Sequence, residues 1–143
     1  MRIQLKRAYA KPSRGDGPRV LVDRLWPRGV SKEKAHLKLW LKELAPSDEL
    51  RKWFHERPQQ WQTFRKKYLA ELANESAISA LELLHELAER SRALTLVFGS
   101  RDVQHNNAVI LKDLLEGGRK PPATSGPVRA VASAPRRAVR PRP

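Results

Sequence analysis

The chain has 143 residues, a net charge of +14 and no cysteine. This length corresponds to one ordinary domain that can bury a core, and the lack of cysteine excludes disulfide bonds, thiolate zinc sites and a cysteine nucleophile. The sequence has no apolar run of about 18 residues, which a membrane span requires, and its first residues alternate charged with apolar side chains, unlike a signal peptide. We therefore expect a soluble cytoplasmic protein with no membrane partner.

The positive charge is divided evenly between two parts of the chain. Seven of the 29 Lys and Arg residues and none of the 15 acidic residues lie in residues 119–143, so this segment carries half of the net charge. It is rich in Pro, Ala and Arg and cannot bury enough apolar surface to offset the entropy of ordering it. The sequence predicts an α/β domain over residues 1–118 and a disordered basic tail over residues 119–143.

The first strands are predicted close to the N-terminus. Residues 3–9 and 19–25 are rich in large apolar side chains, and the turn-forming segment 11–18 separates them. Two neighbouring strands are therefore expected in this part of the chain.

Residues 35–44 fit two kinds of structure. Helical spacing fits Leu37, Trp40, Leu41 and Leu44. Strand alternation places Leu37, Leu39 and Leu41 on one face and Lys38, Trp40 and Lys42 on the other. We favour a strand here, preceded by a short helical turn that Ser31 caps.

The rest of the chain predicts helices around one buried strand. The run 93–98 is apolar almost throughout and is typical of an interior strand. Ser47 is a good N-cap for the first helix, and Gly117 ends the last one. Apolar stripes at helical spacing predict helices over residues 48–54, 58–73, 75–90 and 103–116.

This order of elements predicts an α/β fold with a small, largely parallel sheet of about four strands flanked by helices. In such sheets ligands bind at the carboxyl ends of the strands. The polar residues that follow the four expected strands are Arg7 and Tyr9; Asp23, Arg24, Trp26 and Arg28; Lys42 and Ser47; and Ser100, Arg101, Asp102, His105, Asn106 and Asn107. We expect these residues to share one edge of the sheet.

The chemistry of these residues predicts a small-molecule or anion site. Guanidinium and ammonium groups bind phosphate or carboxylate, a helix N-terminus adds N–H donors, and an indole can wall a pocket. The expected ligand-binding residues are Arg7, Arg24, Trp26, Arg28, Lys42, Ser47, Arg101 and Asn106. The acid or base candidates are Asp23, Asp102 and His105, with His105 expected in the first turn of the last helix.

Each of these residues also has a structural interpretation. Asp23 and Arg24 fit a buried ion pair that locks the sheet edge. Trp26 fits a core position, and Asp102 fits a helix cap. The sequence therefore leaves open whether this edge binds a ligand, carries out chemistry or only braces the fold.

Motifs for cofactors and metals are missing from the sequence. It has no glycine-rich phosphate loop and no GxSxG elbow, and the segment around Gly15 and Gly17 lacks the third glycine of a dinucleotide fingerprint. No two histidines have the close helical spacing of a zinc site. We expect neither a cofactor nor a metal ion.

Four stretches of the chain resemble one family. They are LKRAY, RVLVDRLWPRGVSKEKA, WLKELAPSDELRKWF and TLVFGSRDVQHNNAVILKDLLE. Over about residues 1–116 the chain is similar to the YeaO-like family, domain of unknown function 488. The resemblance implies a small bacterial or archaeal α/β protein and implies no established activity.

The positions that match the family's motifs are Arg7, Asp23, Arg24, Trp26, Pro27, Arg28, Gly29, Lys42, Ala45, Pro46, Ser47, Leu50, Arg51, Asp102, His105 and Asn106. Two positions depart from the family pattern. The pair Trp53-Phe54 is followed directly by His55, where relatives tend to have an intervening glycine. Phe98 stands where a tyrosine is frequent, so a hydroxyl group at that position is not essential.

Three functions remain in competition. The leading one is a small-molecule or phosphate-type anion site at the carboxyl edge of the sheet. The second is a nucleic-acid-binding module that uses the basic body and tail, since a polyanion is attracted by such charge. The third is an interaction domain in which all the motifs are structural. The oligomeric state is left open.

Overall fold

The computed structural model describes residues 2–117 and contains a four-stranded sheet. In spatial order the strands are β1 (Arg2–Arg7), β4 (Ala93–Phe98), β2 (Arg19–Leu21) and β3 (Leu39–Trp40). All neighbouring strands are parallel, which confirms the predicted α/β fold. β4 is buried at every position, as expected for an interior strand of a parallel sheet.

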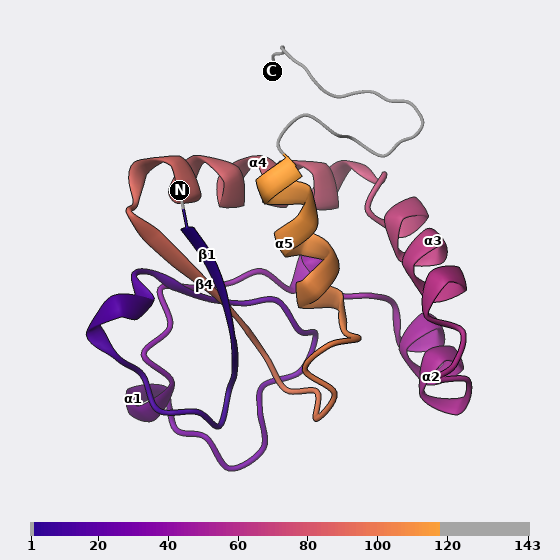
Figure 1. Ribbon diagram of the computed structural model, residues 1–143, viewed down its shortest axis with the longest axis horizontal. Coiled ribbons are helices and arrows are strands. Elements are labelled where there is room, and N and C mark those ends of the chain that lie inside the picture. The colour runs from indigo at the N-terminus through magenta and orange to yellow at the C-terminus, as the bar shows by residue number, and fades with distance from the viewer. Residues whose placement is uncertain (1, 118–143) are drawn as a thin grey trace. The chain divides into compact units, whose positions relative to one another are not determined.

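Helices flank this sheet (Figure 1). Within residues 2–117 they are α1 (Lys32–Ala35), α2 (Asp48–Glu56), α3 (Trp61–Glu71), α4 (Glu75–Arg90) and α5 (Asn107–Gly117), with 3₁₀ turns η1 (Arg14–Asp16) and η2 (Lys42–Leu44). As predicted, Ser31 and Ser47 cap helices: their hydroxyl oxygens accept from the N–H groups of Lys34 and Leu50. None of the helices in the described range is long and apolar enough to cross a membrane.

The core lies between the sheet and the helices. Its largest fully buried side chains are Tyr68, Phe98, Leu21, Leu44, Leu84, Leu94, Leu96, Ile110, Leu111, Val20, Val22 and Val97. These residues come from β2, β4, η2, α3, α4 and α5 and from the first residue after β2. Burial of each leucine or valine contributes roughly 1.5–3 kcal/mol, so this contact between layers holds the loops at the sheet edge in place.

The loop that leads into β2 is held by a buried ionic network. Asp16 and Arg19 are both buried and form an ion pair with a 2.8 Å N–O distance, and Lys6 of β1 contacts the other carboxylate oxygen at 2.9 Å. The hydroxyl group of Thr95 donates to the backbone oxygen of Asp16 at 2.7 Å. Gly17 has a φ of +64°, and a Cβ atom there would lie 2.0 Å from the oxygen of Ala93, so only glycine fits.

Two predicted element boundaries are wrong by four residues, and α3 begins at Trp61, three residues after its predicted start. The strand predicted over residues 19–25 ends at Leu21; beyond it the chain turns into a loop, in which Asp23 accepts from the Gly99 N–H and Trp26 donates to the oxygen of Val30. The helix predicted to begin at residue 103 begins at Asn107. The Asp102 carboxylate accepts from the N–H groups of two following residues and makes a turn, and Asn106 then caps the helix. His105 is therefore in the loop, not in the first helical turn.

The ambiguous segment 35–44 is a short strand, β3, followed by the turn η2. The strand alternative is thus the correct one for its centre.

The sheet and all contacts described below lie within residues 2–112, and residues 113–117 continue α5. The predicted tail, residues 119–143, lies outside the described residues.

Candidate functional site at the carboxyl edge of the sheet

The parallel strands bring the predicted site residues to the carboxyl edge of the sheet, where these residues form separate groups. One group braces the ends of the strands, and a second lines a groove. A third surrounds a small hollow, and the last is a pair of side chains in the loop before α5. The groups have different chemistry.

The bracing group is built around the peptide unit of Gly99, which follows β4. The Gly99 N–H donates to the Asp23 carboxylate at 2.7 Å, and the Gly99 oxygen accepts from the Arg7 guanidinium at 3.1 Å. Arg7 also donates to the oxygen of Ser100 at 2.9 Å and lies over the ring of Tyr9. Arg7 and Asp23 thus join the ends of β1, β4 and β2, and their polar atoms are engaged by backbone.

The Asp23 carboxyl group lies in a low-dielectric part of this edge. Burial raises its pKa above the usual value, although the Gly99 N–H, the Asn107 amide and the Arg51 charge oppose this shift. The Asn107 amide also donates to the oxygen of Val22 at 2.9 Å. Asp23 forms no ion pair with Arg24, because the Arg24 side chain is exposed; the sequence-based interpretation of a buried Asp23–Arg24 pair is wrong.

A groove of about 560 Å³ contains the second group. Arg24 and Lys42 supply its positive charges, and Glu43 and Glu71 its negative charges. Its remaining walls come from Ala45, Ser47, Ala70, Leu72, Asn74 and Ser76. Three of the predicted ligand-binding residues, Arg24, Lys42 and Ser47, therefore meet in one depression.

Ser47 in this groove already binds a carboxylate of the same chain, that of Glu71. Its backbone N–H donates to one oxygen of the Glu71 carboxylate at 2.8 Å, and its hydroxyl group donates to the other oxygen at 2.6 Å. The negative side chain thereby lies at the N-terminus of α2, where the helix dipole stabilises it. These hydrogen bonds stabilise the negative charge of Glu71, and the donors of Ser47 are occupied.

The third group surrounds a hollow of about 230 Å³ beside β3. The hollow is lined by Trp26, Lys32, Leu37, Lys38, Leu39 and Trp40. The rings of Trp26 and Trp40 are in edge-to-face contact, with centroids 5.4 Å apart. Their indole N–H groups donate to the oxygens of Val30 and Asp23, which fixes both rings.

The groove and the hollow meet at one contact. The Lys42 ammonium group lies 4.2 Å from the ring centroid of Trp40, a distance typical of a cation–π interaction. Since Lys42 lines the groove and Trp40 lines the hollow, the two depressions are neighbours.

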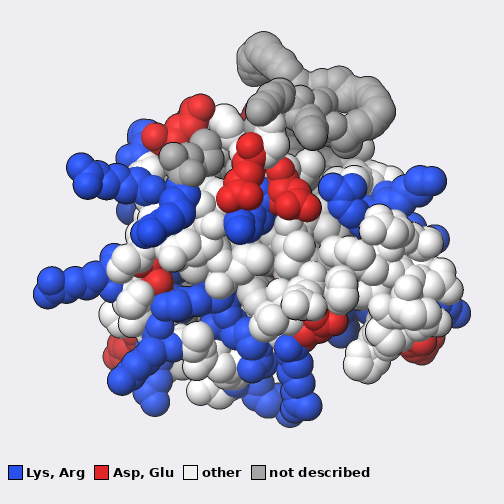
Figure 2. Space-filling model, in the orientation of Figure 1, with Lys and Arg blue, Asp and Glu red and all other residues white. Residues whose placement is uncertain are grey.

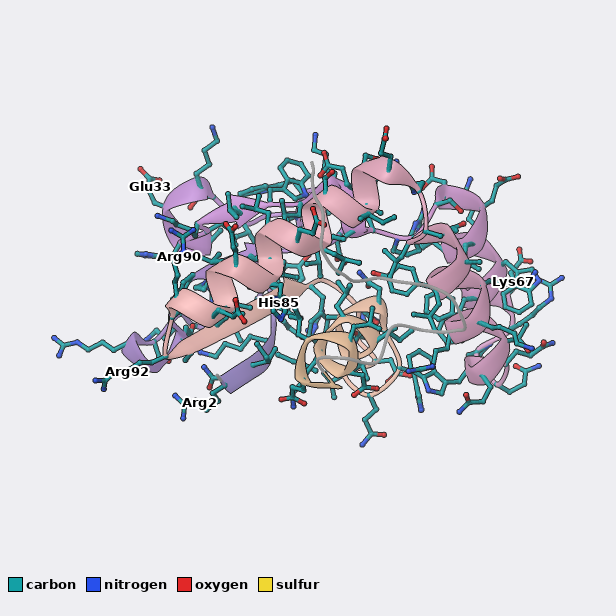
Figure 3. All side chains as sticks on the ribbon, turned by 90° about the horizontal axis from the view of Figure 1, so that it is seen from above. Arg2, Glu33, Lys67, His85, Arg90 and Arg92 are labelled. Atoms are coloured by element: carbon teal, nitrogen blue, oxygen red, sulfur yellow. The ribbon has the colours of Figure 1, made fainter. Side chains whose placement is uncertain are left out.

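Unpaired positive charge is concentrated around these two depressions. Residues 24–42 contain six basic residues and one acidic residue: Arg24, Arg28, Lys32, Lys34, Lys38 and Lys42, with Glu33. None of the six forms an ion pair with another residue of the described part. Lys and Arg side chains gather over the part of the surface that carries α1 (Figures 1 and 2), and Glu33 points away from the body (Figure 3).

The fourth group lies in the loop before α5. The His105 ring nitrogen is 3.3 Å from the Asp102 carboxylate, and the ring contacts that of Trp61. Hydrogen bonds from the Gln104 N–H and then from His105 hold the pKa of Asp102 below its usual value, although slight burial opposes this. Both side chains are substantially exposed.

The remaining predicted residues take different positions. Arg28 and Arg101 are exposed, and neither forms a side-chain hydrogen bond or ion pair within residues 2–117. Neither lines the groove or the hollow. Asn106 is buried and caps α5, so its side chain is used by the backbone. In the described range no group of three or more acidic or histidine side chains is placed to hold a metal ion.

Comparisons with known proteins show the family of this chain. A family model described as "Inactive DUF488-N3 subclade" matches residues 2–128. The chain belongs to the YeaO-like DUF488 family. The match begins at the first strand and includes both the groove and the hollow.

Two relatives show how far the similarity to family members extends. "Uncharacterized protein YeaO" of Escherichia coli K12 is 44% identical over 115 residues, which cover 80% of this chain and 97% of the relative. "Uncharacterized protein Rv3073c" of Mycobacterium tuberculosis H37Rv is 38% identical over 116 residues, which cover 81% and 95% of the two chains. No solved structure matches the chain.

The sequence alone did not predict several residues that line the groove and the hollow at the carboxyl edge of the sheet. Trp40 was predicted only as part of a strand, although the same alternation places it between Lys38 and Lys42 on one face. That pattern was the available signal for the hollow. Glu71 had no such signal, because its contact with Ser47 joins residues 24 positions apart.

Proposed function

We propose that this DUF488 protein binds phosphate-bearing anions in the groove at the carboxyl edge of its sheet. The observation that carries the proposal is that Arg24 and Lys42 line the same depression and that neither has a carboxylate partner within residues 2–117. A guanidinium and an ammonium group that line one depression favour a polyanionic group that can contact both. The groove also contains Glu43 and Glu71; both oxygens of the Glu71 carboxylate accept hydrogen bonds from Ser47 and form no ion pair with Arg24 or Lys42.

The arrangement favours binding without catalysis. The three acid or base candidates, Asp23, Asp102 and His105, are absent from the residues that line the groove. The Asp23 carboxylate is bound by the Gly99 N–H, and Asp102 and His105 contact each other in a loop. The description of the family as an inactive subclade also supports a binding role.

The test is calorimetric titration of the full chain with inorganic tripolyphosphate. The double variant Arg24→Ala/Lys42→Ala should weaken binding by about a hundredfold or more, since each of the two charge-assisted contacts contributes roughly 1.5–3 kcal/mol. A matched control is Lys52→Ala/Lys66→Ala, which removes two exposed lysines of α2 and α3 and should leave binding almost unchanged.

Two outcomes would contradict this function. Equal weakening in both double variants would show that only net charge matters. If wild-type protein does not bind tripolyphosphate at low salt while Arg24→Ala/Lys42→Ala lowers the free energy of unfolding, the residues are structural, and the interaction-domain alternative is the better one.

A further inference from the structure

The hollow beside β3 has the properties of a site for a flat ring. Two tryptophan rings, Trp26 and Trp40, form its walls, and Leu37 and Leu39 add apolar surface. The rings are held by their own N–H bonds to backbone oxygens, so they are positioned before a ligand arrives. Rigid aromatic walls of this kind stack with nucleobases and lose little entropy on binding.

Positive charge surrounds this hollow on more than one side. Lys32 and Lys38 belong to its lining, and Lys42 covers the ring of Trp40 from the side of the groove. The three lysines have no acidic partner within the part of the chain that the structure describes. A ligand that combines a flat ring with more than one phosphate group is complementary to this combination.

The adjacency of groove and hollow sets the order of groups in such a ligand. A phosphate held by Arg24 and Lys42 in the groove places the next group along the ligand beside Trp40, because Lys42 contacts that ring. A second phosphate of the same ligand can then contact Lys32 or Lys38, which line the hollow. A polynucleotide strand offers this chemistry, because each base branches from a sugar that lies between two backbone phosphates.

We propose that this DUF488 protein binds single-stranded nucleic acid, with a base stacked in the Trp26–Trp40 hollow and the flanking phosphates on Arg24, Lys32, Lys38 and Lys42. The proposal rests on the anion groove described above and names the class of its ligand. Stacking together with phosphate contacts is tolerant of base sequence, so binding of many sequences is expected.

The shape of the surface favours a single strand over a duplex. The helix of this basic segment, α1, has only four residues, whereas readout of a duplex uses a helix or ribbon that enters the major groove. In a duplex the bases are stacked on each other and cannot enter the hollow. Anionic membranes are the other polyanionic surface of the cell, and the half-buried, hydrogen-bonded indoles do not protrude as membrane anchors do.

The first measurement is the NMR spectrum of the four indole N–H groups of the wild-type chain, assigned with single Trp→Phe variants. A short oligothymidylate of about 12 nucleotides, within the usual range of strand-binding sites, is added. The signals of Trp26 and Trp40 should shift, and those of Trp53 and Trp61 should stay in place. Trp53 and Trp61 lie on α2 and α3 and are internal controls.

The second measurement is fluorescence anisotropy of the same labelled oligothymidylate over a salt series. Lys32→Ala/Lys38→Ala should weaken binding at least fivefold and should reduce the salt slope by about one unit, since each lost phosphate contact removes about 0.7. Lys52→Ala/Lys66→Ala is the matched control for net charge and should change neither quantity appreciably. A duplex of the same length should bind more weakly than the single strand.

Different results separate this inference from the proposed function. If tripolyphosphate binds and the oligonucleotide binds no tighter and shifts neither Trp26 nor Trp40, the nucleic-acid inference is overturned and the anion function stands. If neither ligand binds at low salt, both fail. Capture of the protein by anionic phosphatidylserine vesicles with no oligonucleotide binding would also overturn the inference, because the surface would then be a membrane-binding one.

Discussion

Two sets of basic residues in this protein have opposite surroundings. Lys6 and Arg19 share the buried carboxylate of Asp16, with contacts of 2.9 and 2.8 Å. The six basic residues of segment 24–42 have no carboxylate partner in the described structure, and four of them, Arg24, Lys32, Lys38 and Lys42, line the groove or the hollow. The first set is neutralised inside the fold, and the second leaves its charge available to solvent and ligands.

This difference teaches how to separate structural cations from cations that are available to a ligand in a strongly basic chain. The charge of the side chain does not distinguish Arg19 from Arg24, and neither does position in the chain, because Arg19 begins β2 and Arg24 follows it closely. The carboxylate partner does distinguish them, because a buried cation without one is costly. The following predictions test whether stability depends on the first set and binding on the second.

The largest expected effect is on stability, in Asp16→Ala. This change leaves Arg19 buried without its partner, which typically lowers the free energy of unfolding by about 3–5 kcal/mol. Urea denaturation followed by circular dichroism measures it. A loss below about 1 kcal/mol, the ordinary cost of a point mutation, would show that the network is not a main support of the loop.

Acid should weaken the same network in the wild-type protein. Burial alone would raise the pKa of Asp16, but hydrogen bonds from Lys6, Ser13 and Arg19 outweigh it and hold the pKa well below the usual value of 3.8. The stabilisation is therefore present above about pH 4 and is lost as pH falls further. Urea midpoints from pH 7 to pH 3 should fall more steeply in wild type than in Asp16→Asn.

The basic segment should show the reverse pattern. Lys32→Ala/Lys38→Ala removes two exposed charges and should change the free energy of unfolding by less than about 0.5 kcal/mol, although it weakens oligonucleotide binding. Chemical denaturation and anisotropy on the same preparation give both values. A clear loss of stability would place these lysines with the structural set.

The smallest expected effect concerns Asp23. Since burial raises its pKa, the folded state disfavours the charged carboxylate, and this group costs stability as pH rises from its unfolded value of 3.8 through the raised folded pKa. Asp23→Asn keeps an oxygen that can accept from the Gly99 N–H. The variant should equal or slightly exceed wild type in stability at pH 7 and lose that advantage at pH 3; greater stability of wild type at pH 7 would contradict the assignment.

The sequence predicted the parallel α/β fold because its signals are local. The apolar run of β4, the serine caps of α1 and α2 and the stripe of α4 all lie within single elements. The start of α5 was misplaced because the Asp102 turn imitates a helix cap four residues too early. Periodicity cannot distinguish these two uses of an aspartate.

The candidate site was predictable only as a collection of residues. Strand order brought Arg24, Lys42 and Ser47 into one groove, as the shared carboxyl edge predicts. The sequence could not predict which of these side chains are bound by other groups of the chain and which are left without a partner. That depends on contacts such as Arg7 to Gly99 and Ser47 to Glu71, which join residues 92 and 24 positions apart.

The clamped peptide of Gly99 has a consequence for how this edge moves. With its N–H held by Asp23 and its oxygen held by Arg7, the loop after β4 begins from a fixed point and shares the rigidity of the central strand. Its amide hydrogen should exchange with deuterated solvent as slowly as those of β4, although it lies beyond the last strand residue. We therefore expect the start of the loop after β4 to open only when the core of the domain opens.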